Sequence, residues 1–167
     1  EPLTAADMLG RSFMAKYAEL HQAGLTNDPN AVSNAMDQVV AENSAALASP
    51  KAYSVADIRT IADSAQATGA YIAAIKTVYT QYATPQDEAK IAGEALETGN
   101  TDELTKVDAS ISDYKSMLTR LLAIPVPMTL EQNHLDLVNG MSALLYSAQA
   151  FRHIDANPLA GFAAVKV

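Results

Sequence analysis

Apolar residues recur every three or four positions along most of the chain, which is the spacing of one face of an α-helix. The steps hold without interruption from Leu104 to Leu121, and a similar stripe runs from Ile58 to Tyr82. No window shows the alternation of apolar and polar residues that is typical of a half-buried strand. The pattern therefore predicts an all-α protein.

Start and stop signals divide these stripes into separate helices. Acidic or hydroxyl residues that can cap a helix precede the stripes, and glycines or prolines follow most of them. The predicted helices cover residues 4–24, 28–47, 54–83, 87–99, 101–121 and 129–154, with a short segment at 157–162. The short connections favour an antiparallel bundle of five to six amphipathic helices with a short C-terminal helical segment. We expect a single helical domain, residues 1–167.

The first two predicted helices carry similar apolar rows. In the first helix, apolar side chains follow one another at helical spacing, and in the second they are expected to form the buried face. The two rows are Leu9, Phe13, Tyr17 and Leu20, and Val32, Ala35, Met36, Val39 and Val40.

Composition and charge exclude several classes of partner and site. The chain has 167 residues, a net charge of −8 and no cysteine. That charge repels a phosphate backbone, so we expect no nucleic-acid partner. The lack of cysteine removes disulfides, thiol nucleophiles and cysteine-bound metal sites. No segment has the roughly 18 to 20 apolar residues needed to cross a bilayer, so we expect no membrane insertion by this segment.

The chain begins with Glu1-Pro2, without a methionine or a signal-peptide pattern. Such a start is typical of a processed mature chain or a trimmed piece. We therefore expect any leader or membrane anchor to lie upstream of Glu1.

Sequence motifs of catalysis are missing. The chain has no G-x-S-x-G, no H-E-x-x-H, no phosphate-binding loop and no Rossmann glycine pattern. Glu131 and His134 form an E-x-x-H pair, but a di-iron bundle needs two such pairs and further glutamates. His21 and His153 lack a glutamate three positions earlier. We predict no catalytic residue, no cofactor and no metal site, and a protein that is not an enzyme.

Residues 123–140 hold the least regular stretch of the chain. Pro125 and Pro127 interrupt the helical pattern, and Thr129 with Gln132 matches a capping box that would start the next helix. His134 then stands within the apolar stripe of that helix. We expect its imidazole to be buried and bound to a loop carbonyl that the prolines leave unpaired, because buried polar groups need partners. A pH-sensitive switch is the alternative, since histidine titrates near neutrality.

The C-terminal third resembles a segment of uncharacterised helical proteins, predicted to be exported or membrane-anchored, from small-genome bacteria of the candidate phyla. The resemblance covers about residues 121–160 and reads I-P-V-P-x-x-L-x-x-x-H-L-x-L-V-N-G, followed by D-x-N-P. It implies an ectodomain outside the cytoplasmic membrane. Its motif is carried by Pro125, Pro127, Leu130, His134, Leu135, Asn139 and Pro158. The residues that we single out as structural are His134, Pro125, Pro127, Thr129 and Asn139.

These observations favour a non-enzymatic helical ectodomain of the cell surface or periplasm, which acts through protein–protein interaction or as part of the envelope structure. Its expected partner is another envelope protein, and it would be anchored through a missing N-terminal segment. The long apolar stripes could also pair with those of a second copy in a homo-oligomer.

The sequence leaves two other functions open. The first is a carrier of a small apolar molecule or lipid between helices, because methionine adapts to irregular cavities. The methionines that would line such a cavity are Met8, Met14, Met36, Met117, Met128 and Met141. The second is a metal-dependent enzyme, which would need carboxylates that converge on His134.

Overall fold

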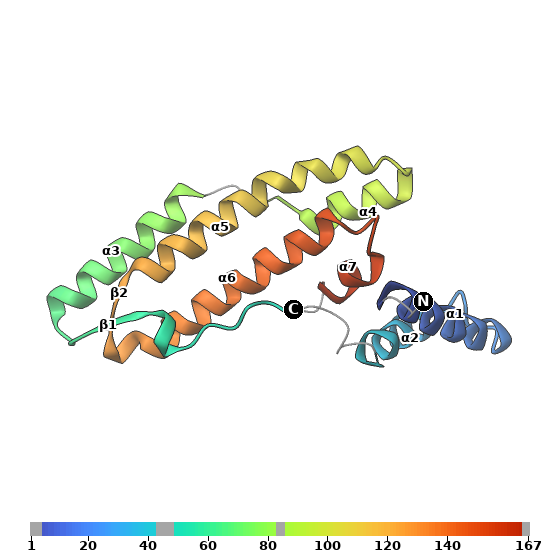
Figure 1. The fold of residues 1–167 in the computed structure, drawn as a ribbon, viewed down its shortest axis with the longest axis horizontal. Coiled ribbons are helices and arrows are strands. Elements are labelled where there is room, and N and C mark those ends of the chain that lie inside the picture. The colour runs from blue at the N-terminus through green and yellow to red at the C-terminus, as the bar shows by residue number, and fades with distance from the viewer. Residues whose placement is uncertain (1–4, 43–48, 83–85, 165–167) are drawn as a thin grey trace.

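The all-α class predicted from the sequence is confirmed. A computed structural model describes residues 5–42, 49–82 and 86–164, and most of these residues are helical (Figure 1). The α-helices are α1 (Ala5–Gln22), α2 (Pro29–Glu42), α3 (Ala65–Gln81), α4 (Glu88–Thr98), α5 (Val107–Ala123), α6 (Glu131–Arg152) and α7 (Pro158–Ala164). Within the described ranges they are connected by the 3-10 helices η2 (Val55–Asp57), η3 (Thr101–Lys106) and η4 (Met128–Leu130) and by the short strands β1 (Arg59–Ile61) and β2 (Pro125–Pro127).

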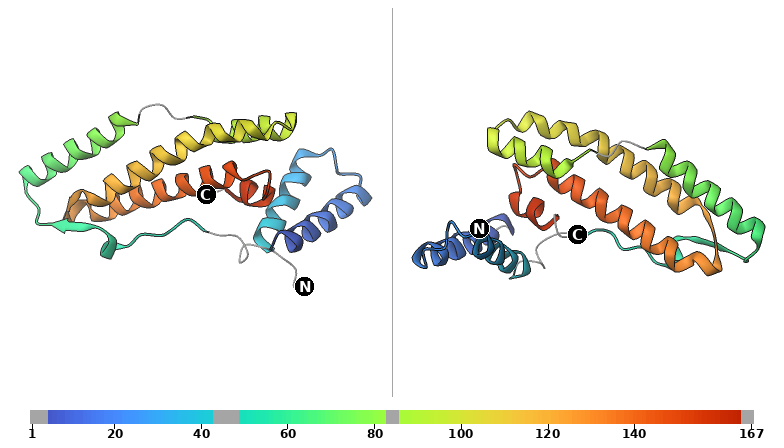
Figure 2. Two further views of the ribbon diagram at one scale, coloured as in Figure 1. Left: turned by 45° about the horizontal axis from the view of Figure 1, so that its top comes forward. Right: turned by 180° about the vertical axis from the view of Figure 1, so that it is seen from behind.

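Helices α5 and α6 form the centre of the structure. They pack along each other in opposite directions, and α3 lies against α5 (Figures 1 and 2). Leu118 and Leu121 of the predicted stripe are buried between them, together with Val138 and Met141 of α6. Because side chains three and four positions apart share one helix face, the regular stripe of α5 gives a continuous buried seam.

A second core cluster lies at the far end of the α5–α6 pair. Its members come from α4, η3, the end of α6 and the turn that follows α6, and they are Ala92, Ala95, Leu104, Phe151 and Ile154. The Tyr114 hydroxyl donates to Glu88 Oε1 over 3.0 Å and so connects α5 to α4. Gly99 ends α4 at φ 70°, a backbone conformation that glycine adopts without strain. These contacts fix α4 against the central pair.

Two predicted helix starts are confirmed by their caps. Asp28 Oδ1 accepts from the N–H groups of Asn30 and Ala31 at the start of α2. Asp87 Oδ1 accepts from the N–H of Lys90 at the start of α4. The predicted helix start at residue 4 and the predicted ends at residues 47 and 83 lie outside the described residues.

The predicted helix at residues 54–83 is wrong over its first third. Ser54 and Asp57 do form the expected cap, since the N–H and hydroxyl of Ser54 both donate to Asp57 Oδ2. However, the cap starts only the single turn of η2, and β1 follows. Helix α3 begins after Ser64, whose hydroxyl oxygen accepts from the N–H of Ala67 at 3.0 Å.

Two short strands occur although no window of the sequence shows strand alternation. Strands β1 and β2 pair in parallel, with Thr60 opposite Val126. Pro125 and Pro127 have no N–H, so Val126 supplies the N–H that β2 can donate to this pair. Each strand is only three residues long, and its partner is 66 positions away, so local periodicity carries no trace of the pairing.

An extended segment, residues 49–54, runs along α6 and is held by side chains of that helix (Figure 2). Asn139 brackets the backbone of Tyr53: its Oδ1 accepts from the Tyr53 N–H at 2.7 Å, and its Nδ2 donates to the Tyr53 carbonyl at 3.2 Å. One turn further along α6, the Ser142 hydroxyl donates to the Lys51 carbonyl at 2.7 Å. These bonds satisfy peptide groups that neither a helix nor a sheet would satisfy.

We predict that Asn139→Ala lowers the free energy of unfolding by about 1–3 kcal/mol, because a half-buried peptide group loses both of its partners. Urea unfolding followed by circular dichroism measures the change. Asn133→Ala is the matched control, since Asn133 is exposed on the same helix and its loss should change stability by less than about 0.5 kcal/mol. Equal effects of the two substitutions would contradict the role given to Asn139.

Candidate functional site

His134 is the most deeply buried polar side chain of the central helices, with 0 % of its surface exposed. Its Nε2 lies 3.1 Å from the Leu121 carbonyl oxygen, and its Nδ1 lies 3.3 Å from the Tyr71 hydroxyl. The rings of Tyr71 and His134 meet edge to face, with centroids 5.6 Å apart. One imidazole thus connects α3, α5 and α6.

The position of Pro125 explains why the Leu121 carbonyl binds an imidazole. In an α-helix, the carbonyl of residue 121 accepts from the N–H of residue 125, which proline does not have. The Leu121 carbonyl instead accepts from the N–H of Ile124 at 3.0 Å and from His134. A carbonyl only accepts, so Nε2 carries the proton and Nδ1 accepts from the Tyr71 hydroxyl.

Burial sets the charge state of this group. It lowers the pKa of His134 from the ordinary 6.5, because an imidazolium would lose its hydration there, and the bond to the Leu121 carbonyl offsets this only in part. Burial, and next the neighbouring Tyr79, raise the pKa of Tyr71 above 10.0, so its hydroxyl stays protonated and can donate. The pair is neutral at physiological pH and is arranged as a structural connection.

The capping box expected at Thr129 and Gln132 is not formed. Helix α6 begins at Glu131, and no side chain caps it. The N–H and hydroxyl of Thr129 both donate to Asp63 Oδ1, at 3.1 and 2.9 Å, and Gln132 donates to Asp136. The reason is tertiary: Asp63 follows β1, and the pairing of β1 with β2 brings it to Thr129. Sequence reasoning missed Asp63 because its acceptor role depends on that pairing.

The histidines and acidic residues do not gather into one cluster. Both ring nitrogens of His134 already have partners, and His21 and His153 are exposed. In the described part of the chain, no group of three or more histidine, aspartate or glutamate side chains is placed to hold a metal ion. Arg152, next to His153, instead pairs with Asp108 at 2.9 Å.

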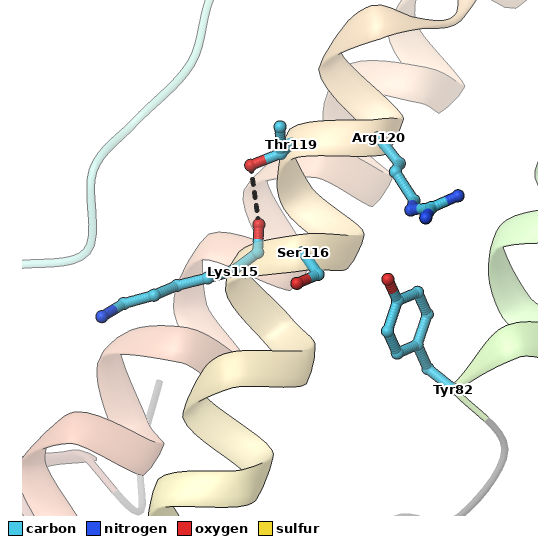
Figure 3. A pocket seen from close by; sticks show the side chains of 5 residues that line it. All are labelled: Tyr82, Lys115, Ser116, Thr119 and Arg120. Atoms are coloured by element: carbon cyan, nitrogen blue, oxygen red, sulfur yellow. Dashed lines mark hydrogen bonds between the residues drawn. The ribbon is translucent and has the colours of Figure 1, made fainter.

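A shallow depression of about 290 Å³ lies between the end of α3 and α5 (Figure 3). Arg120 stands over the ring of Tyr82, 5.9 Å from its centroid, and Ser116 faces the same space, whereas Lys115 points away from it. The C-terminal end of α3 lies beside this space and carries partial negative charge, which disfavours an anion. Arg120 and the hydroxyls of Ser116 and Tyr82 therefore do not form an anion-binding site.

A second hollow of about 150 Å³ lies between α1 and α2, and we call it the hairpin groove. Most of its lining is apolar, and both predicted rows contribute to it. The residues that line it are Phe13, Lys16, Tyr17, Leu20, Thr26, Val32, Ala35, Met36 and Val39. Of these, only Val39 is fully buried, so the two rows face each other without closing the space.

Three large apolar side chains of the hairpin are exposed. The exposed fractions of Met14, Tyr17 and Leu25 are 62 %, 46 % and 41 %. The α1–α2 hairpin lies beyond the end of the central pair that carries α7 (Figure 1). The periodicity of the sequence identified the two apolar rows. It did not show that both rows stay partly exposed, because their exposure depends on which other helices cover them.

Five of the six methionines considered for a carrier cavity have described side chains, and these five do not come together. Met117 and Met141 are part of the central core, and Met36 lines the hairpin groove. Met14 and Met128 are exposed, and the side chain of Met8 lies outside the described part.

We predict that His134→Ala lowers the free energy of unfolding by about 2–5 kcal/mol, because it leaves a cavity and takes a donor from the Leu121 carbonyl. Thermal or urea unfolding measures the loss. His21→Ala, at an exposed position of α1, is the control and should leave the melting temperature unchanged. An unchanged melting temperature for His134→Ala would rule out the structural role.

The lowered pKa of His134 predicts a pH dependence. Below pH 6.5 the unfolded chain binds a proton at this residue, whereas the folded protein does not until its own lower pKa is reached. The contribution to stability is therefore complete above pH 6.5 and is lost as the pH falls below it. Because a single proton is involved, the free energy of unfolding changes by at most about 1.4 kcal/mol per pH unit.

The measurement compares the native chain with His134→Gln, whose amide can still donate to the Leu121 carbonyl, by urea unfolding between about pH 8 and pH 5.5. Both proteins keep His21 and His153, so the difference reports His134 alone. Parallel pH profiles would contradict the assignment.

Comparison with known proteins adds no relative: no protein-family model, no curated protein and no solved structure matches this chain. Among the described residues, no helix is both long enough and apolar enough to span a membrane.

Proposed function

We propose that this chain is a non-enzymatic helical domain of the cell surface or periplasm that acts through contact with another envelope protein. The observation that carries the proposal is the half-open hairpin groove, together with the exposure of Met14, Tyr17 and Leu25 on the same hairpin. Contiguous exposed apolar surface that is rimmed by polar residues is typical of protein interaction sites.

The construction of the hairpin supports this function. Two helices can cover only one side of each other, so the apolar row of each helix keeps an open flank. In the central body, by contrast, the apolar rows of α5 and α6 are covered by α3, α4 and the extended segment, and the hydrophobic side chains exposed there, such as Ile72, Leu96 and Leu144, lie outside these core clusters. The hairpin therefore offers apolar surface that the remainder of the described chain does not use for its own core.

The buried chemistry of the central body also fits a scaffold role. His134 could serve an acid–base function only if one ring nitrogen were accessible, and both are bonded inside the core. The expected place outside the cytoplasmic membrane rests on the resemblance of residues 121–160 to exported or anchored proteins.

Photo-crosslinking in native cells tests the proposal. A photoreactive amino acid is placed singly at Met14, Ile72 or Leu144, which are exposed on α1, α3 and α6. We expect a specific adduct with another envelope protein from at least one position, and recovery of the chain in the envelope fraction. Absence of adducts from all three positions in folded protein, or recovery only in the cytoplasm, would contradict the proposal.

A further inference from the structure

We infer that the hairpin groove receives an amphipathic helix of the partner protein, which seats one large apolar side chain in the groove and places basic residues beside α2. This inference rests on the proposed function and specifies its contact site and the chemistry of its partner.

The spacing of the lining residues fits a third helix. On α1 the lining positions are 13, 16, 17 and 20, and on α2 they are 32, 35, 36 and 39. Both sets follow the i, i+3, i+4, i+7 pattern, so both helices present a straight ridge along their length. A helix laid between two such ridges completes a three-helix unit, which is the common mode of helix recognition by apolar grooves.

The volume of the groove fits one side chain. A dry apolar cavity of about 150 Å³ holds a single benzene ring in a well-studied lysozyme variant, and the hairpin groove is of the same size, about 150 Å³. The space exists because Ala35 stands among larger residues of α2, where a leucine would fill it. An apolar anchor of the partner, such as leucine or phenylalanine, would therefore remove the void and contribute most of the affinity.

The charges of α2 select the partner. Asp28 at its N-cap and Glu42 at its C-terminal end stand seven positions before and after Ala35, on the same side of the helix as the groove, and the helix contains no lysine or arginine. On α1, Lys16 at the groove is paired with Glu19 at 3.2 Å. A partner helix with lysine or arginine beside its apolar stripe is attracted to this edge, whereas an acidic helix is repelled.

The same charges disfavour two other occupants. A second copy of this chain also carries a net charge of −8, so pairing of two hairpins would bring acidic edges together. An anionic membrane surface is repelled for the same reason.

The experiment uses fluorescence anisotropy with the full chain and two synthetic helical peptides. Both peptides have leucine at i, i+3, i+4 and i+7; one has flanking lysines and the other has flanking glutamates. We expect the lysine peptide to bind at least about tenfold more tightly than the glutamate peptide, and its affinity to fall as salt is added.

The variant Ala35→Leu fills the groove without removing any contact of the hairpin, so the protein should remain folded by circular dichroism. We expect it to weaken binding of the lysine peptide by at least about tenfold. Ala73→Leu is the matched control, because Ala73 is exposed on α3 and its replacement should leave binding unchanged.

Four outcomes would overturn the inference. The first is binding of the lysine peptide that Ala35→Leu does not change, or no binding at all. The second is a dimer of the chain in sedimentation that Ala35→Leu dissociates, which would assign the groove to a second copy. The third is a small apolar molecule that is retained in native mass spectrometry and lost in Ala35→Leu, without peptide binding.

The fourth outcome is crosslinking from Ile72 or Leu144 but not from Met14. It would refute the hairpin groove as the contact site and leave the proposed function standing.

Discussion

The bond between His134 and the Leu121 carbonyl is the constraint on which the central body depends. Proline at 125 ends α5 and leaves that carbonyl without its helical donor, and the imidazole from the start of α6 supplies the missing N–H. Nδ1 of the same ring accepts from the Tyr71 hydroxyl and so fixes α3 against the connection between α5 and α6. Because His134 and Leu121 are fully buried, the imidazole and the carbonyl would each be costly to leave without a hydrogen-bond partner.

Polar side chains of α6 hold the irregular part of the fold in the same way. Asn139 and Ser142 satisfy the peptide groups of an extended segment that has no sheet of its own, and Asp63 binds Thr129 across the β1–β2 pair. A pair of three-residue strands is too short to be stable alone. The strands persist because Val126 is completely buried between the helices and because these side chains hold both ends.

The α1–α2 hairpin follows a different principle. Its rows are as regular as those of α5, but each has only one neighbour, so Val39 is buried while Met14 and Tyr17 stay exposed. A void of about 150 Å³ remains between the helices. In the central body, the apolar rows of α5 and α6 are covered by neighbouring elements, although Ile72, Leu96 and Leu144 are exposed. The hairpin rows lack such a cover and present a groove that another helix could occupy. This contrast is the physical basis for placing the contact site on the hairpin.

Local chemistry determined the helical class, the caps at Asp28 and Asp87, and the rows on α1, α2 and α5, because these depend on neighbours within a few residues. The sequence also contained the reason for the histidine contact, since Pro125 stands four positions after Leu121. Only the tertiary structure decided that Ser54 starts one turn instead of a helix, that Thr129 binds Asp63 instead of capping α6, and that the hairpin rows stay open. Each of these features depends on a partner far away in the chain or on the lack of a covering helix. Helical periodicity carries information about neither.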